Sequence, residues 1–222
     1  MLINIRQLAN RYRFPCGSVL HIGASTAEEL TCYREAGFSK FMWVEPDHRV
    51  IDELRQRLAS APPSEHHRLV GHAAGHSTTK IDFYPASNQQ SSSSCLPPEL
   101  HRELYPDIAF NEPDRYQVYC LRTEELITRD GELNFKVDFL NIDVQGFELS
   151  VLIGLGVRLA DIPAVYVEVN TAELYRGCAK LWELDRYLAA FDFVRLDTVM
   201  TDAHWGDAFY LQRDRLPGRT TP

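Results

Sequence analysis

The chain has 222 residues, 45% of them hydrophobic, which favours one α/β domain over residues 1–222 with a large buried core. Its net charge of -8 argues against nucleic acid or an anionic membrane as the main partner, because both attract a basic surface. The five scattered cysteines have neither zinc nor redox spacing, and the N-terminus lacks a signal-peptide pattern, so we expect a cytoplasmic protein with reduced thiols.

A buried strand is predicted over residues 19–22, after a short helix over residues 2–13. The strand runs into a turn of small residues, in which Gly23 can take backbone angles that a side chain forbids. Ala24 and Ser25 leave space above this turn. A ligand could therefore approach the backbone at this point of the chain.

The next helix is predicted over residues 26–35, with Ser25 or Thr26 as its cap and Glu28 in its first turn. A second apolar strand then ends on Glu45. A carboxylate in this place can accept hydrogen bonds from both hydroxyls of a ribose, so the two segments suggest a mononucleotide site. The alternative is an ordinary strand–helix unit, and the single glycine argues against a dinucleotide fingerprint.

Pro46 opens a further helix that is predicted to run to about residue 59. A third strand and its exit are expected over residues 68–74, and a strand over 80–84 in a small hairpin. Residues 85–114 are too long for a normal connection, and we interpret them as a lid-like insertion. Within it, the run Ser91–Ser94 either hydrogen-bonds a polar ligand or is simply flexible.

The rest of the chain predicts strands over 116–120, 137–142, 164–170, 193–196 and 207–211, and helices over 123–127, 146–152 and 181–191. Alternation of strands and helices indicates a doubly wound, mostly parallel sheet, in which ligands bind at the carboxyl ends of the strands. The last two strands are expected to form an antiparallel pair, because only a loop separates them. Polar residues fall near several predicted strand ends: Glu45, His72, Asp143, Glu168 and Asn170.

Three motifs resemble the FkbM-type methyltransferases, whose motifs read approximately D-V-G-A-N-x-G-x, F-E-P and I-D-V-E-G-x-E. Here they are H-I-G-A-S-T-A-E over His21–Glu28, V-E-P-D over Val44–Asp47 and I-D-V-Q-G-F-E over Ile142–Glu148. The resemblance covers roughly residues 18–212. It implies the Rossmann-like fold of class I methyltransferases, with a seven-stranded, mostly parallel sheet, a terminal antiparallel hairpin, and S-adenosylmethionine as cofactor.

The resemblance also implies where that cofactor lies. The turn around Gly23 would contact its methionine part, Glu45 would hold the ribose, Asp47 or its neighbours would lie by the adenine, and Asp143 would face the methyl group. The implied cofactor-binding residues are His21, Gly23, Ala24, Ser25, Glu28, Glu45, Pro46, Asp47, Ala73, Ala74 and Asp143.

Three positions of the first motif depart from the family, which usually has an acid at position 21, Asn at 25 and Gly at 27. His21 can form hydrogen bonds but cannot offer a carboxylate to the ammonium group of the ligand. Glu28 or Asp143 could do so instead.

Asp143 is our first candidate for orienting or deprotonating the methyl acceptor, the alternative being a cap of the following helix. Glu168 is expected beside it, where the pair could share a proton or bind a divalent metal. No compact Asp-Asp motif accompanies them, so we expect no metal site. His72 and His204 are weaker candidates for the base, and Tyr175, Trp182 and Trp205 are candidates for stacking on a sugar.

These features together predict an O-methyltransferase that acts on a hydroxyl of a sugar, glycan or glycosylated or polyketide-like metabolite. Its partners would be a small-molecule or glycan acceptor and, as one option, a second copy of the chain in a homodimer. One alternative is a nucleotide-dependent oxidoreductase on a Rossmann sheet. Another is a binding module that keeps the methyltransferase fold without activity, an option that the departures at positions 21 and 27 keep open.

Overall fold

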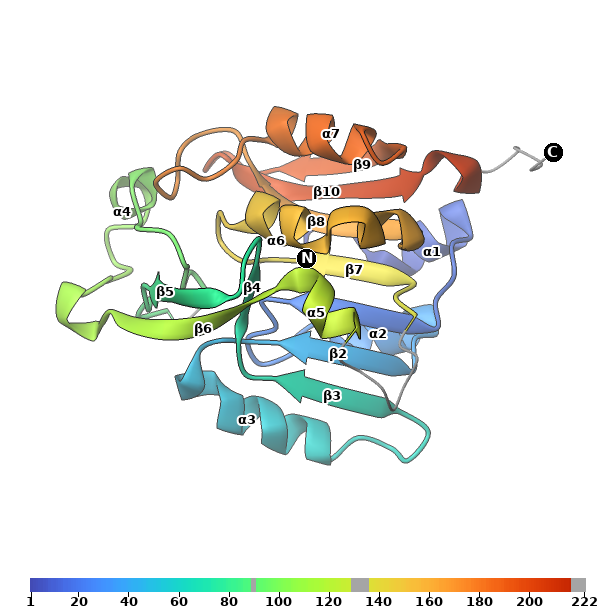
Figure 1. The fold of residues 1–222 in the computed structure, drawn as a ribbon, viewed down its shortest axis with the longest axis horizontal. Coiled ribbons are helices and arrows are strands. Elements are labelled where there is room, and N and C mark those ends of the chain that lie inside the picture. The colour runs from blue at the N-terminus through green and yellow to red at the C-terminus, as the bar shows by residue number, and fades with distance from the viewer. Residues whose placement is uncertain (89–90, 129–135, 217–222) are drawn as a thin grey trace.

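Seven strands form the main sheet, in the order β3-β2-β1-β7-β8-β10-β9 (Figure 1). The computed structural model describes residues 1–88, 91–128 and 136–216. The strands of this sheet are β1 (Ser18–Ile22), β2 (Lys40–Val44), β3 (His66–Val70), β7 (Phe139–Ile142), β8 (Ala164–Asn170), β9 (Phe193–Met200) and β10 (Trp205–Gln212). All neighbours are parallel except β10, which runs antiparallel to both β8 and β9. The predicted sheet and its terminal hairpin are thus confirmed.

From β1 the chain adds β2 and β3 on one side of the sheet and later adds β7 and β8 on the other side. Strand β1 therefore lies between β2 and β7. In the register of these pairs, Ile22 lies opposite both Val44 and Ile142. Each of these three residues is the last of its strand. The segments that follow β1, β2 and β7 therefore leave the sheet side by side, at the switch point where doubly wound sheets bind ligands.

The apolar side chains of the strands alternate between two cores, one on each face of the sheet. Leu20 and Ile22 face a core that includes α6 and α7, whereas Val19 and Phe41 face a core that includes α1 and α2. The helices are α1 (Ile5–Tyr12), α2 (Leu30–Ala36), α3 (His48–Ala59), α4 (Leu100–Leu104), α5 (Thr123–Thr128), α6 (Glu148–Leu155) and α7 (Leu181–Ala189), with short 3₁₀ helices at Glu112–Asp114, Gly156–Asp161 and Arg213–Arg215. None of the described helices is long and apolar enough to cross a bilayer.

A second sheet of three strands, β4-β6-β5, lies beyond the ends toward which the arrows of β2 and β3 point (Figure 1). Its strands are β4 (Ala73–Gly75), β5 (Thr79–Phe83) and β6 (Tyr116–Arg122). Within the predicted third strand and its exit over residues 68–74, β3 ends at Val70, and the exit leads into β4, a strand that was not expected and that pairs with β6. The predicted local hairpin is wrong, since β5 pairs with the distant β6. Burial of Ala73, Phe83 and Val118 in a separate apolar cluster stabilises this sheet.

The insertion over residues 85–114 packs onto the same end of the main sheet. Ser94 forms a bridge with Tyr84, and Pro98 forms one with Tyr175, which lies after β8. Phe110 and Tyr175 belong to one buried apolar cluster, so the described part of the insertion shares an apolar core with the segment after β8.

Candidate functional site

Gly23 brings the chain after β1 against the chain after β7. Its N–H donates to the carbonyl of Val44 at 2.9 Å, while the N–H of Asp143 donates to the carbonyl of Ile22 at 2.9 Å. The φ of Gly23 is +87°, and an added Cβ would lie 1.7 Å from the carbonyl oxygen of Asp143. Only glycine fits this approach, which places the first turn and Asp143 in direct contact.

The turn after Gly23 is longer than the sequence predicted. Helix α2 begins at Leu30, and its N-cap residue Glu29 makes no capping hydrogen bond through its side chain. The predicted helix start at residue 26, with a cap at Ser25 or Thr26, is therefore wrong. Ser25 and Ala27 have φ of 44° and 57°, a region that Asn and Gly adopt more readily than Ser or Ala. The departures from the family at these positions thus place about 1–3 kcal/mol of backbone strain at each.

Glu45 leaves the end of β2 and is buried with both carboxylate oxygens occupied by backbone donors. One oxygen accepts from the N–H of Ser25 at 2.7 Å and the other from the N–H of Asp47 at 2.8 Å. Burial raises the pKa of Glu45 to about 7. The carboxylate is therefore fixed in place, keeps free lone pairs for a ligand, and changes its charge near neutral pH.

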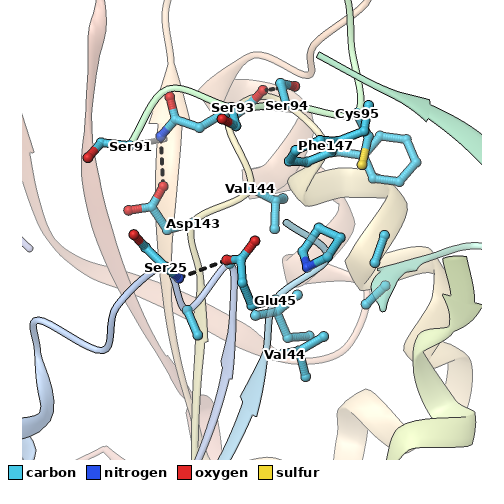
Figure 2. Close-up of a pocket in the computed structure, with 18 of the residues that line it drawn as sticks. Ser25, Val44, Glu45, Ser91, Ser93, Ser94, Cys95, Asp143, Val144 and Phe147 are labelled. Carbon is cyan, nitrogen blue, oxygen red and sulfur yellow. Dashed lines mark hydrogen bonds between the residues drawn. The ribbon is translucent and has the colours of Figure 1, made fainter. Parts of the chain in front are cut away.

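A first cavity opens between the Gly23 turn, Glu45 and the serine run of the insertion. Figure 2 shows Ser25 and Glu45 across this cavity from Ser91, Ser93, Ser94 and Cys95, with Asp143 and Val144 between them. Its lining consists of Ile22, Gly23, Ala24, Ser25, Glu28, Glu29, Val44, Glu45, Pro46, His72, Ala73, Ala74, Phe83, Ser91, Ser93, Ser94, Cys95, Asp143, Val144, Gln145 and Phe147.

A second cavity adjoins the first and is lined by further residues of the insertion. Glu28, Glu29, Ser91, Asp143 and Gln145 line both. The other residues of the second cavity are Met1, Leu2, Asn88, Ser92, His101, Tyr105, Ile108, Glu168, Leu174, Trp205 and Asp207. Two ligands can thus meet at Asp143, one in each cavity.

Glu168, at the end of β8, lies beside Asp143 as predicted from the strand order. The side-chain amide of Gln145 donates to Asp143 at 2.8 Å and to Glu168 at 2.6 Å. Burial raises the pKa of Glu168 well above its usual value, and the nearby charges of Asp143 and Glu148 add to this effect. Glu168 therefore favours its neutral form.

Three residues of the predicted site lie outside both cavities, and these assignments need correction. His21 is buried within the sheet, where its ring nitrogens contact Tyr33 and Asn141 at 3.3 and 3.1 Å. Burial lowers the pKa of His21 to about 4, so the ring is neutral. Its place on β1 points it into the core that includes α1 and α2, away from a ligand after the strand.

Asp47 caps α3 by accepting from the N–H of Arg49 at 3.0 Å, and it also accepts from the hydroxyl of Tyr116 at 2.9 Å. The side chain is buried in these contacts and does not line the first cavity. His204 is exposed next to Thr171 and lines neither cavity, so a role as base is unsupported.

The three candidates for stacking on a sugar lie in different environments. Tyr175 is fully buried and Trp182 is exposed on α7, whereas Trp205 lines the second cavity and donates to the hydroxyl of Tyr105 at 2.8 Å. Among the described residues, no group of three or more His, Cys, Asp or Glu side chains is arranged to hold a metal ion.

Sequence reasoning missed Gln145, Phe83 and Phe147. Gln145 and Phe147 lie inside the third motif, and the position of Gln145 two residues after Asp143 is a signal that could have singled it out. Phe83 had no such signal, because it reaches the cavity only through the pairing of β5 with β6.

Comparisons with known proteins agree with this geometry. The family described as Methyltransferase FkbM domain matches residues 21–200. Magnesium protoporphyrin IX methyltransferase (ChlM) from Synechocystis PCC 6803, solved with bound SAM, superposes with a TM-score of 0.52 and 9% identity, over 94% of this chain and 74% of its own. TrmK from M. capricolum, in complex with S-adenosylhomocysteine, superposes with a TM-score of 0.51 and 7% identity, over 95% and 69%. At these low sequence identities, the structural similarity shows that the chain has the class I methyltransferase fold and nothing beyond the fold. No curated protein matches the sequence.

Proposed function

This chain belongs to the FkbM methyltransferase family, and we propose that it binds S-adenosylmethionine in the first cavity and methylates a hydroxyl of a sugar, glycan or glycosylated or polyketide-like metabolite. The observation that carries the proposal is Glu45, a buried carboxylate fixed by two backbone donors at the end of β2, beside the Gly23 turn. This arrangement suits a ribose diol, whose hydroxyls donate to a carboxylate.

The two ends of the first cavity differ in a way that suits the two ends of the cofactor. Ala73, Ala74 and Phe83 offer an apolar wall for the adenine on the side of the second sheet. Glu28 and Asp143, near the Gly23 turn, offer carboxylates to the ammonium and sulfonium charges of the methionine part. The methyl group would then point toward the second cavity.

Methyl transfer from sulfur to oxygen is an in-line displacement. The acceptor oxygen forms a bond to the methyl carbon, the carbon–sulfur bond breaks with its electrons left on sulfur, and the hydroxyl proton leaves. Asp143 lines both cavities and is placed to accept this proton. Trp205 and Tyr105 on the wall of the second cavity suit the apolar face of a sugar ring, and Ser92 and Asn88 suit its hydroxyls.

Calorimetry with S-adenosylhomocysteine tests cofactor binding. We expect saturable binding to the wild type and a loss of about 10- to 100-fold in affinity for Glu45→Gln, because an amide loses charge-assisted hydrogen bonds to the ribose. The matched control is Glu53→Gln on the exposed face of α3. A folded wild type that binds NADH but not S-adenosylhomocysteine would instead indicate the oxidoreductase alternative.

The pH dependence of this binding follows from the pKa of Glu45, which is about 7. If the ionised form binds the ribose, affinity should rise by about tenfold from pH 6 to pH 8, as the ionised fraction grows. Glu45→Gln should remove most of this rise. Calorimetry across this range in buffers of equal ionic strength measures it, and a flat wild-type profile contradicts the assignment.

The folding stability of the free protein should decrease with rising pH, whereas the affinity for the ligand increases. The folded pKa values of Glu45 and Glu148, each about 7, lie above the usual value of 4.5, so burial favours their neutral forms. Their contribution to stability is fully present below about pH 4.5 and is lost as the pH rises through about 7. Because S-adenosylhomocysteine should bind more tightly at pH 8 than at pH 6, the rise in unfolding temperature that it causes should grow over this range in thermal melts.

Product formation tests the acceptor. Incubation with labelled S-adenosylmethionine and a panel of sugars and glycosylated metabolites should yield a methyl ether on at least one member. If the cofactor binds but no hydroxyl compound reacts, while an amine or thiol does, the proposed acceptor class is wrong.

A further inference from the structure

The side-chain amide of Gln145 lies between the carboxylates of Asp143 and Glu168. Its nitrogen is 2.8 Å from an oxygen of Asp143 and 2.6 Å from an oxygen of Glu168. An amide nitrogen has two hydrogens, so one goes to each carboxylate. Asp143 directly follows β7 and Glu168 lies on β8, the neighbouring strand of the main sheet, and Gln145 links the two acids at the wall that both cavities share.

The Gln145 amide makes a third contact through its oxygen. The hydroxyl of Tyr175 lies 2.9 Å from the amide oxygen of Gln145 and 2.9 Å from the carbonyl oxygen of Ser92, and it donates its single hydrogen to one of them at a time. The reversed amide would turn its oxygen toward Asp143, which accepts but cannot donate when it is ionised and ready to take a proton. Asp143 gives only its Oδ1 to this bridge, which leaves Oδ2 available to a ligand.

The backbone around Gln145 is also held firmly. One oxygen of the buried Glu148 accepts from the N–H groups of Val144 and Gly146, at 3.3 and 2.9 Å. Gly146 has φ of +99°, and a Cβ there would lie 3.0 Å from the Cβ of Tyr175. The close packing of these two segments places the tyrosine hydroxyl at the amide. Ser94, from the insertion, adds a hydrogen bond of 2.7 Å to the carbonyl of Gln145.

Two adjacent carboxylates are stabilised by a shared proton, by a bridging cation or by hydrogen-bond donors placed between them. Resting on the proposed function, we propose that the Gln145 amide occupies the place that a divalent cation would take between Asp143 and Glu168, and that the pair takes the acceptor's proton without a metal ion. Gln145 thus acts as a positioning residue. One hydrogen of its amide holds Oδ1 of Asp143, the acceptor proton passes to Oδ2 as the methyl–oxygen bond forms and the carbon–sulfur bond breaks, and the proton later leaves to solvent.

This proposal predicts a latent metal site. Gln145→Glu replaces the donor by a third carboxylate, so that oxygen ligands from Asp143, Glu168 and the new side chain converge, as divalent cations prefer. Titration with Mn²⁺, followed by the electron paramagnetic resonance signal of the free ion, should show one site in this variant. Its dissociation constant should be at least about tenfold lower than any seen for the wild type. Adding Asp143→Asn to the variant should abolish the site.

Controls separate this effect from added surface charge and from misfolding. Gln56→Glu, on the exposed face of α3, adds the same charge and should gain no site. Gln145→Ala removes the bridge without adding a charge, and it should bind Mn²⁺ more weakly than Gln145→Glu but more tightly than the wild type. The proposal is overturned if the wild type binds Mn²⁺ through Asp143 and Glu168, or if neither Gln145 variant binds more tightly than the wild type.

Kinetics with an acceptor from the panel tests the positioning role. Wild-type turnover should be unchanged by EDTA. Gln145→Ala should lower kcat by about a hundredfold while the KM for S-adenosylmethionine changes little, because the base is misoriented and the cofactor contacts at Glu45 remain. Loss of turnover with EDTA overturns the proposal. A failure of S-adenosylhomocysteine to bind would reject the proposed function, whereas the Mn²⁺ result reports on Gln145 independently.

Discussion

Gly23→Ala should abolish cofactor binding and destabilise the fold by at least about 3 kcal/mol. The new Cβ would lie 1.7 Å from the carbonyl oxygen of Asp143, so the segments after β1 and β7 would have to separate. The residue would also have to keep a φ of +87°, which alanine rarely adopts. Urea unfolding and calorimetry with S-adenosylhomocysteine measure the two effects.

Gly37→Ala is the matched control for this substitution. Gly37 ends α2 with φ of +99°, but an added Cβ would meet no atom within 4 Å. This variant carries the conformational cost without the clash, so it should lose about 1 kcal/mol and bind the cofactor normally. Equal losses in the two variants would show that the contact with Asp143 does not set the requirement for glycine.

Asp143→Asn should reduce kcat by about 10²- to 10⁴-fold, while the affinity for S-adenosylhomocysteine falls by no more than about tenfold. The asparagine side chain has nearly the same shape and can still accept the hydrogen bond from Gln145, but it cannot take a proton from the acceptor. Single-turnover rates with labelled S-adenosylmethionine and a reactive acceptor measure the effect on chemistry.

Asp52→Asn, on the exposed face of α3, is the control for loss of one negative charge and should leave the rate unchanged. If Asp143→Asn turns over at the wild-type rate, the proton leaves by another route. Glu168, the other member of the pair, then becomes the group to substitute.

The main sheet could be predicted because its strands are short apolar runs between turn residues. The runs that became β1, β2 and β7 are buried on both faces, as parallel strands are, and each is followed by the residue that the site uses: Gly23, Glu45 and Asp143. The second sheet could not be read in the same way. Its strand β4 has three residues, too few for a periodic pattern, and its pairing with β6 depends on contacts far away in the sequence.

Two expectations for the first motif fail because the local sequence pattern does not show which contacts the folded chain makes. The motif places His21 at the cofactor. Because side chains alternate along a strand, His21 faces the same side of β1 as the buried Val19 and points into the core instead. Ser25 resembles a helix cap, yet its backbone N–H donates to Glu45, and this hydrogen bond holds the chain in a turn before the helix begins. In both cases a contact with a distant strand outweighs the local preference.

The wall that the two cavities share has a thermodynamic consequence. Because Asp143, Gln145 and Ser91 contribute to both cavities, a ligand in one alters the surface presented to the other. Linkage requires the effect to be reciprocal: an acceptor that changes the affinity for S-adenosylhomocysteine by some factor has its own affinity changed by the same factor. Compounds that occupy the second cavity should therefore reveal themselves as shifts in a S-adenosylhomocysteine titration, which makes the cofactor product a reporter for an acceptor before any methyl group has moved.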